Sequence, residues 1–273
     1  MKKLRSRGVG ALLVFFVAFM GLVCGTAPAG ADEQGACEDV KLTGSGSVDF
    51  LSQYIWRGYA LSAGSAVMQP SFTLGSHGFS FNVWGNFDTA QELFSHGAKW
   101  NETDFTGSYS RELFKNFTGT VGTIYYNLPN GRFDALEVYG GVAYAFPWFT
   151  VGFTTYREVT HTPGWWMQLD LSRNFPLPWC GMSVDLGMTF GYLVLLDDDT
   201  LVHPSGRLDS YSAFHSGTLN AGLRIPVLKW LTLTPKIGFA FPLTGEAADI
   251  IEANSWDGES THVFGGLNIT AAF

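Results

Sequence analysis

Apolar and polar residues alternate with a period of two along most of the chain after Gly46, which is the side-chain spacing of a β-strand. The C-terminus is a clear case: apolar residues occupy every second position from Val263 to Phe273, opposite His262, Asn268 and Thr270. Most such stretches reach the roughly 9 to 11 residues that a tilted strand needs to cross a bilayer. The pattern predicts strands over 46–57, 66–76, 78–89, 100–112, 116–127, 134–146, 148–158, 164–174, 181–193, 211–225, 230–242 and 260–273.

The connections between these stretches alternate in length and character. Counted from the N-terminus, every second one is short, as in "SHG", "LFKN", "FPW", "FPLPWCG" and "VLKW", whereas the others are longer or more polar, as in "VLLDDDTLVHPSGRLDS" and "LTGEAADIIEANSWDGE". Short turns at one end and long loops at the other are typical of outer-membrane barrels, and a sheet in lipid has to close because its edges find no water. We therefore predict an all-β protein, a closed up-and-down antiparallel transmembrane β-barrel of about 12 strands.

A helical membrane protein is the alternative that one uncharged segment suggests, Tyr139–Tyr156. Pro147 lies in its middle, Gly140, Gly141 and Gly152 weaken a helix, and both flanks alternate as strands do. Two strands that meet at a Pro-Trp turn explain the segment better than a helix.

The N-terminus has the composition of a secretory signal peptide. Lys2, Lys3, Arg5 and Arg7 precede an apolar core, and small residues end at Ala31. We expect residues 1–31 to be cleaved, residues 32–45 to form a periplasmic N-terminal segment, and residues 46–273 to form the barrel. Both ends of the barrel chain then face the periplasm of a Gram-negative cell, with the protein integral to the bacterial outer membrane.

Composition agrees with a lipid-facing surface and excludes one class of partner. Only 15% of the residues are charged and 15% are aromatic, against roughly 25% charged in typical soluble domains. Cleavage after Ala31 removes four of 16 basic residues and none of the 24 acidic ones, so the mature chain has a formal charge of −12. Nucleic acid is not expected as a partner; outer-membrane lipid and small solutes are.

Charged residues within the predicted strands fall opposite the apolar faces, which indicates a polar lumen. Acids outnumber bases among them, so a water-filled lumen is expected to favour cations. The alternative is a packed internal salt-bridge network that plugs a narrow barrel. The candidate pore-lining residues are Asp49, Gln53, Arg57, Gln69, Asp88, Glu102, Asp104, Glu137, Asp170, Asp185, Arg224 and Lys236.

One motif is more specific than the strand pattern. "SQYIWRGYALS" at Ser52–Ser62, the following Gln69 and "VWGNFD" at Val83–Asp88 resemble the N-terminal part of the TorF-type porin family of outer-membrane barrels. The resemblance implies the fold and the location, but no substrate. On the parity of Asp49 and Gln53, Arg57 is expected to point inward at the outer end of strand one, either narrowing the pore or pairing with lumenal carboxylates while Gly58 turns the chain.

Candidate chemistry elsewhere is weak, so no enzyme activity and no cofactor is expected. His203-Pro204-Ser205 is similar to the His-x-Ser of lipolytic outer-membrane barrels, but Pro204 splits it within a loop. Asp197-Asp198-Asp199 lacks the glycine spacing of a calcium loop, and no metal site is predicted. We expect tryptophans to form girdles at the two membrane interfaces: Trp84, Trp148, Trp165, Trp166, Trp179 and Trp230.

Two features of the chain ends add expectations. A C-terminal aromatic on a closing strand resembles the signal that the outer-membrane barrel assembly machinery recognises, so Phe273 is the candidate assembly signal and that machinery a partner. Cys37 and Cys180 are both expected on the periplasmic side, where they form a possible disulfide. Together these features favour a porin-like channel for small solutes or ions, with a non-conducting structural or adhesive barrel as the alternative and a lipolytic enzyme as the third.

Overall fold

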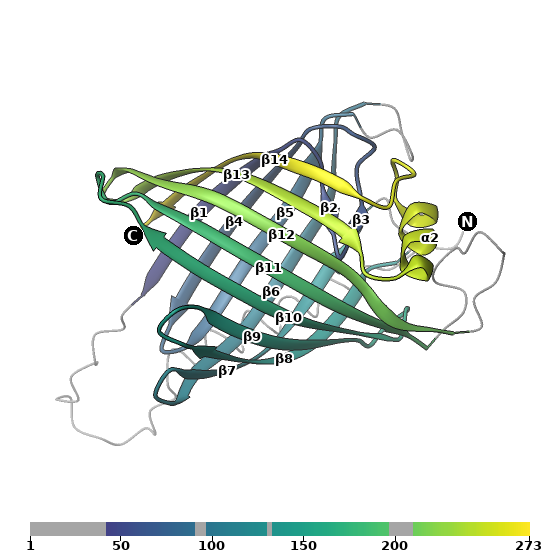
Figure 1. The fold of residues 1–273 in the computed structure, drawn as a ribbon, viewed down its shortest axis with the longest axis horizontal. Coiled ribbons are helices and arrows are strands. Elements are labelled where there is room, and N and C mark those ends of the chain that lie inside the picture. The colour runs from purple at the N-terminus through teal and green to yellow at the C-terminus, as the bar shows by residue number, and fades with distance from the viewer. Residues whose placement is uncertain (1–41, 91–96, 130–132, 197–209) are drawn as a thin grey trace, which may run out of the picture. The chain divides into compact units, whose positions relative to one another are not determined.

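A computed structural model describes residues 42–90, 97–129, 133–196 and 210–273. Twelve antiparallel strands close into one barrel, each bonded to its neighbours in the sequence and β1 bonded to β14 (Figure 1). The wall strands are β1 (Thr43–Leu51), β4 (Val67–Ser76), β5 (Phe79–Asp88), β6 (Lys99–Phe114), β7 (Phe117–Asn127), β8 (Ala135–Ala145), β9 (Thr150–Glu158), β10 (Gly164–Pro176), β11 (Ser183–Leu195), β12 (Tyr211–Leu228), β13 (Leu231–Pro242) and β14 (His262–Ala272). The predicted fold class and number of strands are confirmed.

The first and last strands close the barrel. β1 pairs with β14 from Ser45 opposite Ala272 to Leu51 opposite Gly266. Beyond this ladder, the Phe273 amide donates to the Gly44 carbonyl at 2.9 Å, and the Phe273 ring covers Gly44 so closely that a Cβ there would lie 2.3 Å from it. The chain therefore stays ordered to its last residue by pairing with β1, which begins at Thr43 rather than at Gly46.

The alternation seen in the sequence separates an apolar outer wall from a polar inner one. Outward side chains are large, apolar and exposed, among them Phe50, Phe72, Val121, Val138, Phe153, Leu169, Leu186, Leu219, Ile237 and Val263. Inward positions on the same strands carry Ser, Thr, Asn, Gln and charged residues, which bond across the strands as described below. Among the described residues, no helix is long and apolar enough to span a membrane.

The two ends of the barrel differ in their connections, as predicted. The end at which β1 begins and β14 ends carries the short turns and is called here the terminal end. At the opposite end, called the loop end, most of the connections are longer. Figure 1 shows the helix α2 (Gly245–Asn254) at the loop end, away from the C-terminus.

Two elements at the loop end differ from the prediction. The strand expected over 46–57 ends at Leu51, and Ser52–Ala66, the inner hairpin, turns into the barrel with β2 (Ile55–Trp56) paired to β3 (Tyr59–Ala60). Arg57 and Gly58 have φ values of 49° and 96°, as a two-residue hairpin turn requires. A Cβ on Gly58 would lie 2.7 Å from the Ser216 side chain, so the turn also needs glycine for space.

The second unpredicted element is α2, which lies in a connection expected to be a loop. The Thr244 hydroxyl caps it by accepting from the Ala247 amide at 3.1 Å. Ala247, Ile250 and Ile251 are fully buried on one face. The helix forms because this face packs against the barrel lumen.

Candidate functional site

The inner hairpin and α2 pack together inside the loop end of the barrel. Trp256, just after α2, donates its amide to the Ala60 carbonyl at 2.8 Å, and the Ala60 amide donates to the Ser255 hydroxyl at 3.1 Å. Both elements join a buried cluster with the wall, formed by Tyr59, Trp166, Leu193, Leu195, Tyr211, Ile250 and Ile251. We call the inner hairpin, α2 and the wall residues that they contact the constriction.

Arg57, at the tip of the inner hairpin, reaches across to Glu137 on β8. Its two terminal nitrogens donate to the two carboxylate oxygens at 2.7 and 2.8 Å. The Tyr126 hydroxyl donates to Glu137 Oε2 at 2.9 Å. The side chains of Arg57 and Glu137 are only 14% and 5% exposed, so this is a buried, bidentate ion pair.

Aromatic rings surround the Arg57 guanidinium. Its Cζ lies 4.5 Å from the ring centroid of Trp56, 5.1 Å from Tyr156 and 5.3 Å from Trp166. The backbone is held as well, because the Ser216 hydroxyl donates to the Arg57 carbonyl at 3.0 Å. The hairpin tip is thus fastened to β8, β9, β10 and β12 at once.

More carboxylates lie beside this pair. Glu102 is 7% exposed and hydrogen-bonds Tyr54 of the inner hairpin, and Asp104 interacts electrostatically with both Glu102 and Glu137. Burial, and after it the negative charge of Glu102 and Asp104, raises the pKa of the Tyr54 phenol well above its usual value. Tyr54 therefore remains a neutral donor, and its ring packs 5.6 Å from Trp84.

Further hydrogen-bonded polar groups complete the constriction. Gln69 donates to Asn86 at 3.0 Å, and Asn86 donates to Asn101 at 2.7 Å. The Ser65 hydroxyl donates to Asp88 at 2.5 Å. At the rim, Asp257 accepts from Gln53 and lies 3.2 Å from His262. Asn86 and Asp88 are completely buried, so this part of the constriction is closed to solvent.

The lumen towards the terminal end is different. Near this end Arg224 lies 4.0 Å from Asp185 with side chains 55% and 44% exposed, whereas Lys236 pairs with Asp49 at 2.6 Å, nearer the constriction, with side chains 35% and 20% exposed. Asn220 is exposed although it shares the inward face of β12 with Arg224. These exposures show that solvent reaches this part of the lumen, which we call the terminal half.

Other candidates on the wall also make contacts on the inner face of the barrel. Asp170 accepts from Gln168 at 2.9 Å and from Thr189 at 2.6 Å across the inner face of β10 and β11. Gln53 and Arg57 lie in the inner hairpin and not on strand one, which is a correction, because the chain leaves the wall after Leu51. Whether the candidate residues line a conducting pore stays a prediction.

The expected tryptophan girdles are only partly present. Trp148, Trp179 and Trp230 are 71%, 62% and 55% exposed at the short turns, and Trp165 is 38% exposed on the outer wall. Trp166 is buried in the lumen and Trp84 packs on Tyr54, so the interpretation of these two residues as membrane-interface anchors was wrong. Both have inward parity on their strands.

Several predictions lie outside the described residues: Cys37, the pair His203 and Ser205, and Asp197–Asp199. Cys180 is exposed in the turn between β10 and β11, at the terminal end, so the possible disulfide stays a prediction. Within the described part of the chain, no group of three or more His, Cys, Asp or Glu residues is arranged to hold a metal ion.

The sequence analysis missed functional-site residues on the wall and at the rim. The Arg57–Glu137 pair is contacted by Tyr126, Tyr156 and Trp166. Beneath α2, the Tyr211 hydroxyl and His215 Nδ1 form a hydrogen bond of 2.9 Å. Inward parity and position near the outer strand ends were a usable signal, since each of these aromatic residues interrupts an otherwise polar face.

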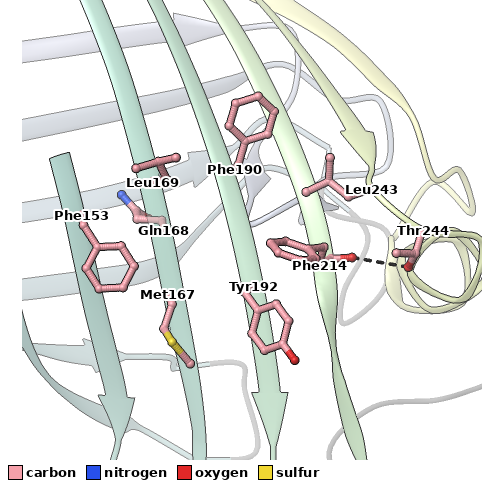
Figure 2. A pocket seen from close by; sticks show the side chains of 9 residues that line it. All are labelled: Phe153, Met167, Gln168, Leu169, Phe190, Tyr192, Phe214, Leu243 and Thr244. Atoms are coloured by element: carbon pink, nitrogen blue, oxygen red, sulfur yellow. Dashed lines mark hydrogen bonds between the residues drawn. The ribbon is translucent and has the colours of Figure 1, made fainter. Parts of the chain in front are cut away.

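A hollow on the outer wall crosses β9 to β12 near the loop end. Figure 2 shows the residues that line it along these strands, with the Thr244 hydroxyl bonded to the Phe214 carbonyl at 3.4 Å. Its lining is Phe153, Met167, Gln168, Leu169, Phe190, Tyr192, Phe214, Leu243 and Thr244. Because Phe153, Leu169 and Phe214 belong to the exposed outward face, the hollow belongs to the outer wall and not to the lumen.

Comparison with known proteins identifies a family and a fold. Residues 33–200, more than half of the chain, match a family described as "Bacterial protein of unknown function (Gcw_chp)". No curated protein matches the sequence. Among solved structures, the NanC porin has a TM-score of 0.51 at 10% identity, covering 85% of this chain and 98% of its own. An outer-membrane channel from Pseudomonas putida F1 has a TM-score of 0.49 at 8% identity, covering 89% and 100%. The first likeness supports a porin-type barrel fold.

Proposed function

We propose that this chain, which belongs to the Gcw_chp family of bacterial proteins of unknown function, is a porin-like outer-membrane channel for small solutes or ions, with no chemistry of its own. The observation that carries the proposal is the solvent-exposed terminal half of the lumen. There, inward charges such as Arg224 and Asp185 remain about half exposed although they lie inside a closed wall. A barrel built only as a scaffold has no need of such a hydrated interior.

Several features support the outer membrane as the location. The outward face is a band of exposed apolar side chains, and exposed tryptophans gather at the short turns. The signal peptide expected over 1–31, assembly through Phe273 and the resemblance of Ser52–Ser62 to the TorF-type porin family point to the same compartment. Outer-membrane lipid and the barrel assembly machinery are the partners that this location implies.

The constriction is compatible with a channel because the inner hairpin and α2 are not strands of the barrel wall. β2 and β3 pair only with each other, and α2 lies in the connection between β13 and β14. Displacement of the inner hairpin would leave every wall ladder intact. The barrel is accordingly a channel whose outer end is narrowed by a removable segment.

The same packing favours one alternative, a non-conducting barrel that binds partners through its loops. Conductance of the purified full-length mature protein in planar bilayers separates the two functions. We expect discrete current steps from the folded, heat-modifiable barrel and none from heat-unfolded protein. If neither the wild type nor a variant without the inner hairpin passes current, this result would contradict the channel and favour the structural barrel. Phospholipid hydrolysis that Ser205→Ala abolishes would instead support the lipolytic enzyme.

A further inference from the structure

The barrel wall carries a complete binding site for a planar cation, and the chain itself fills it. We propose that Glu137, Tyr126, Tyr156 and Trp166 form a site for guanidinium-type organic cations, which Arg57 occupies as a tethered ligand. The four residues come from β8, β7, β9 and β10, whereas Arg57 comes from the inner hairpin. The site gives the proposed channel a solute class, and only that consequence for transport rests on the proposed function.

The geometry selects a guanidinium. Both Glu137 oxygens accept from Arg57, at 2.7 and 2.8 Å, which is the two-pronged arrangement that a planar fork of donors makes and an ammonium does not. The Tyr126 hydroxyl holds Oε2 at 2.9 Å and so fixes the carboxylate. The wall rings of Tyr156 and Trp166 lie 5.1 and 5.3 Å from the guanidinium carbon, within the range of cation–π attraction.

The charge balance selects a cation over an anion. Glu137 is the carboxylate that Arg57 contacts, and both of its oxygens face the guanidinium, so the wall side of the site carries negative charge. Without Arg57, Glu137 would keep its tyrosine partner inside the barrel but lose the cation that both of its oxygens bond. A buried carboxylate of this kind is strongly destabilised until a positive charge replaces the one removed.

The tether explains why the wild type keeps its site filled. A ligand on a short loop next to its site has an effective concentration in the millimolar range or above. Free cations of the same type therefore compete poorly with Arg57, and removal of the Arg57 side chain should reveal the site. A solute that carries a guanidinium group would enter by the same exchange, releasing the hairpin tip.

Another arginine provides a matched control. Arg157 lies on β9 with its Cζ 5.2 Å from the ring of Trp165, at outward positions of two paired strands. Like Arg57, Arg157 lies against an aromatic ring, but it does not contact the Glu137 carboxylate. Arg157→Ala removes an arginine from a ring in the same way, but leaves no cation site behind.

The test is a titration of the full-length mature barrel in detergent with methylguanidinium chloride, followed by tryptophan fluorescence, because Trp56 and Trp166 border the site. Arg57→Ala should bind saturably in the millimolar range, at least tenfold more tightly than the wild type and than Arg157→Ala. The double variant Arg57→Ala with Glu137→Gln should lose this binding at least tenfold. Methylammonium should bind Arg57→Ala roughly tenfold more weakly, since it lacks the fork. Heat-modifiability on gels verifies folding, and Arg57→Gln replaces Arg57→Ala if that variant fails to fold.

Three outcomes would overturn the proposal. The first is that a folded Arg57 variant shows no saturable binding of methylguanidinium. The second is that this variant and the wild type bind methylguanidinium with equal affinity. The third is that the variant binds methylguanidinium and methylammonium with equal affinity. Binding is measured without conduction, so its failure is distinct from failure of the channel. A silent barrel in planar bilayers that still binds methylguanidinium would contradict the function proposed above and leave the cation site in place.

Discussion

Two arginine–carboxylate pairs within the same lumen have opposite environments. Arg57 and Glu137, in the constriction, form two short bonds and are 14% and 5% exposed, whereas Arg224 and Asp185, in the terminal half, lie 4.0 Å apart and are 55% and 44% exposed. The first pair is enclosed by aromatic rings from the hairpin and the wall. The second lies beside Gly222 and Gly187, positions that add no side chain to the lumen.

The difference lies in what satisfies the charge. In the terminal half, water solvates the groups and the pair adds little to stability. In the constriction, protein has replaced water, so each charge depends on its partner and on the bonds around it. The same wall thus carries a hydrated passage at one end and a packed closure at the other, and substitutions of the same kind should have different effects in the two places.

Removal of the inner hairpin should produce the largest effect. Replacement of Tyr54–Leu61 by a short Gly-Ser linker removes Arg57 and Trp56 but no wall strand, so single-channel conductance should rise several-fold. Asn220→Ala changes only an exposed side chain in the terminal half. This variant should therefore have nearly the same conductance as the wild type. An unchanged conductance after hairpin removal would mean that another part of the chain limits flow.

Neutralising one carboxylate of each pair should separate their contributions to stability. Glu137→Gln leaves the Arg57 charge buried without its partner and should cost about 3–5 kcal/mol. Asp185→Asn breaks an exposed pair and should cost about 1 kcal/mol or less. Urea unfolding followed by tryptophan fluorescence measures both, and equal losses would contradict the assignment of a dry and a wet half.

The division between wall and lumen was predictable from sequence because period-two alternation depends on local geometry alone. The closing strand Val263–Phe273 and the connection lengths were enough to predict a closed barrel, and the structure confirms it. The helix α2 also had readable signals that were not used: Thr244 as a cap, followed by Ala247, Ile250 and Ile251 at helical spacing.

The constriction was not predictable in the same way. Arg57 and Glu137 are 80 residues apart, and their meeting depends on a hairpin turn and on the register of several strands. "Arg-Gly" is not among the strongest signals of a two-residue turn, so the alternation of Ser47, Asp49 and Leu51 was extended past the true end of β1. The alternation along their strands gives Trp84 and Trp166 inward positions, but both were expected at the membrane interface because they are tryptophans.

Thiol accessibility would sharpen the boundary between the halves without changing charge. In a background with Cys37 and Cys180 replaced by Ser, Asn220→Cys should react readily with a charged thiol reagent. Asn86→Cys should react at least tenfold more slowly, because Asn86 is completely buried and bonded to Gln69 and Asn101. Equal labelling rates would show that water fills the lumen along its whole length.

Ion selectivity should show the smallest effect, because the exposed charges of the terminal half nearly balance. The inward acids Asp49, Asp170 and Asp185 outnumber the inward bases Arg224 and Lys236 by one, and in the constriction Glu137 balances Arg57. The excess of acids predicts a modest preference for cations.

Raising salt from about 0.1 M to 1 M shortens the Debye length from roughly 10 to 3 Å, so the preference for cations should fade in reversal-potential measurements. Arg224→Gln should strengthen it and Asp185→Asn weaken it, since both side chains are open to solvent. Anion selectivity at low salt would mean that Arg224 and Lys236 dominate the path, and it would reverse the sign assigned to the terminal half.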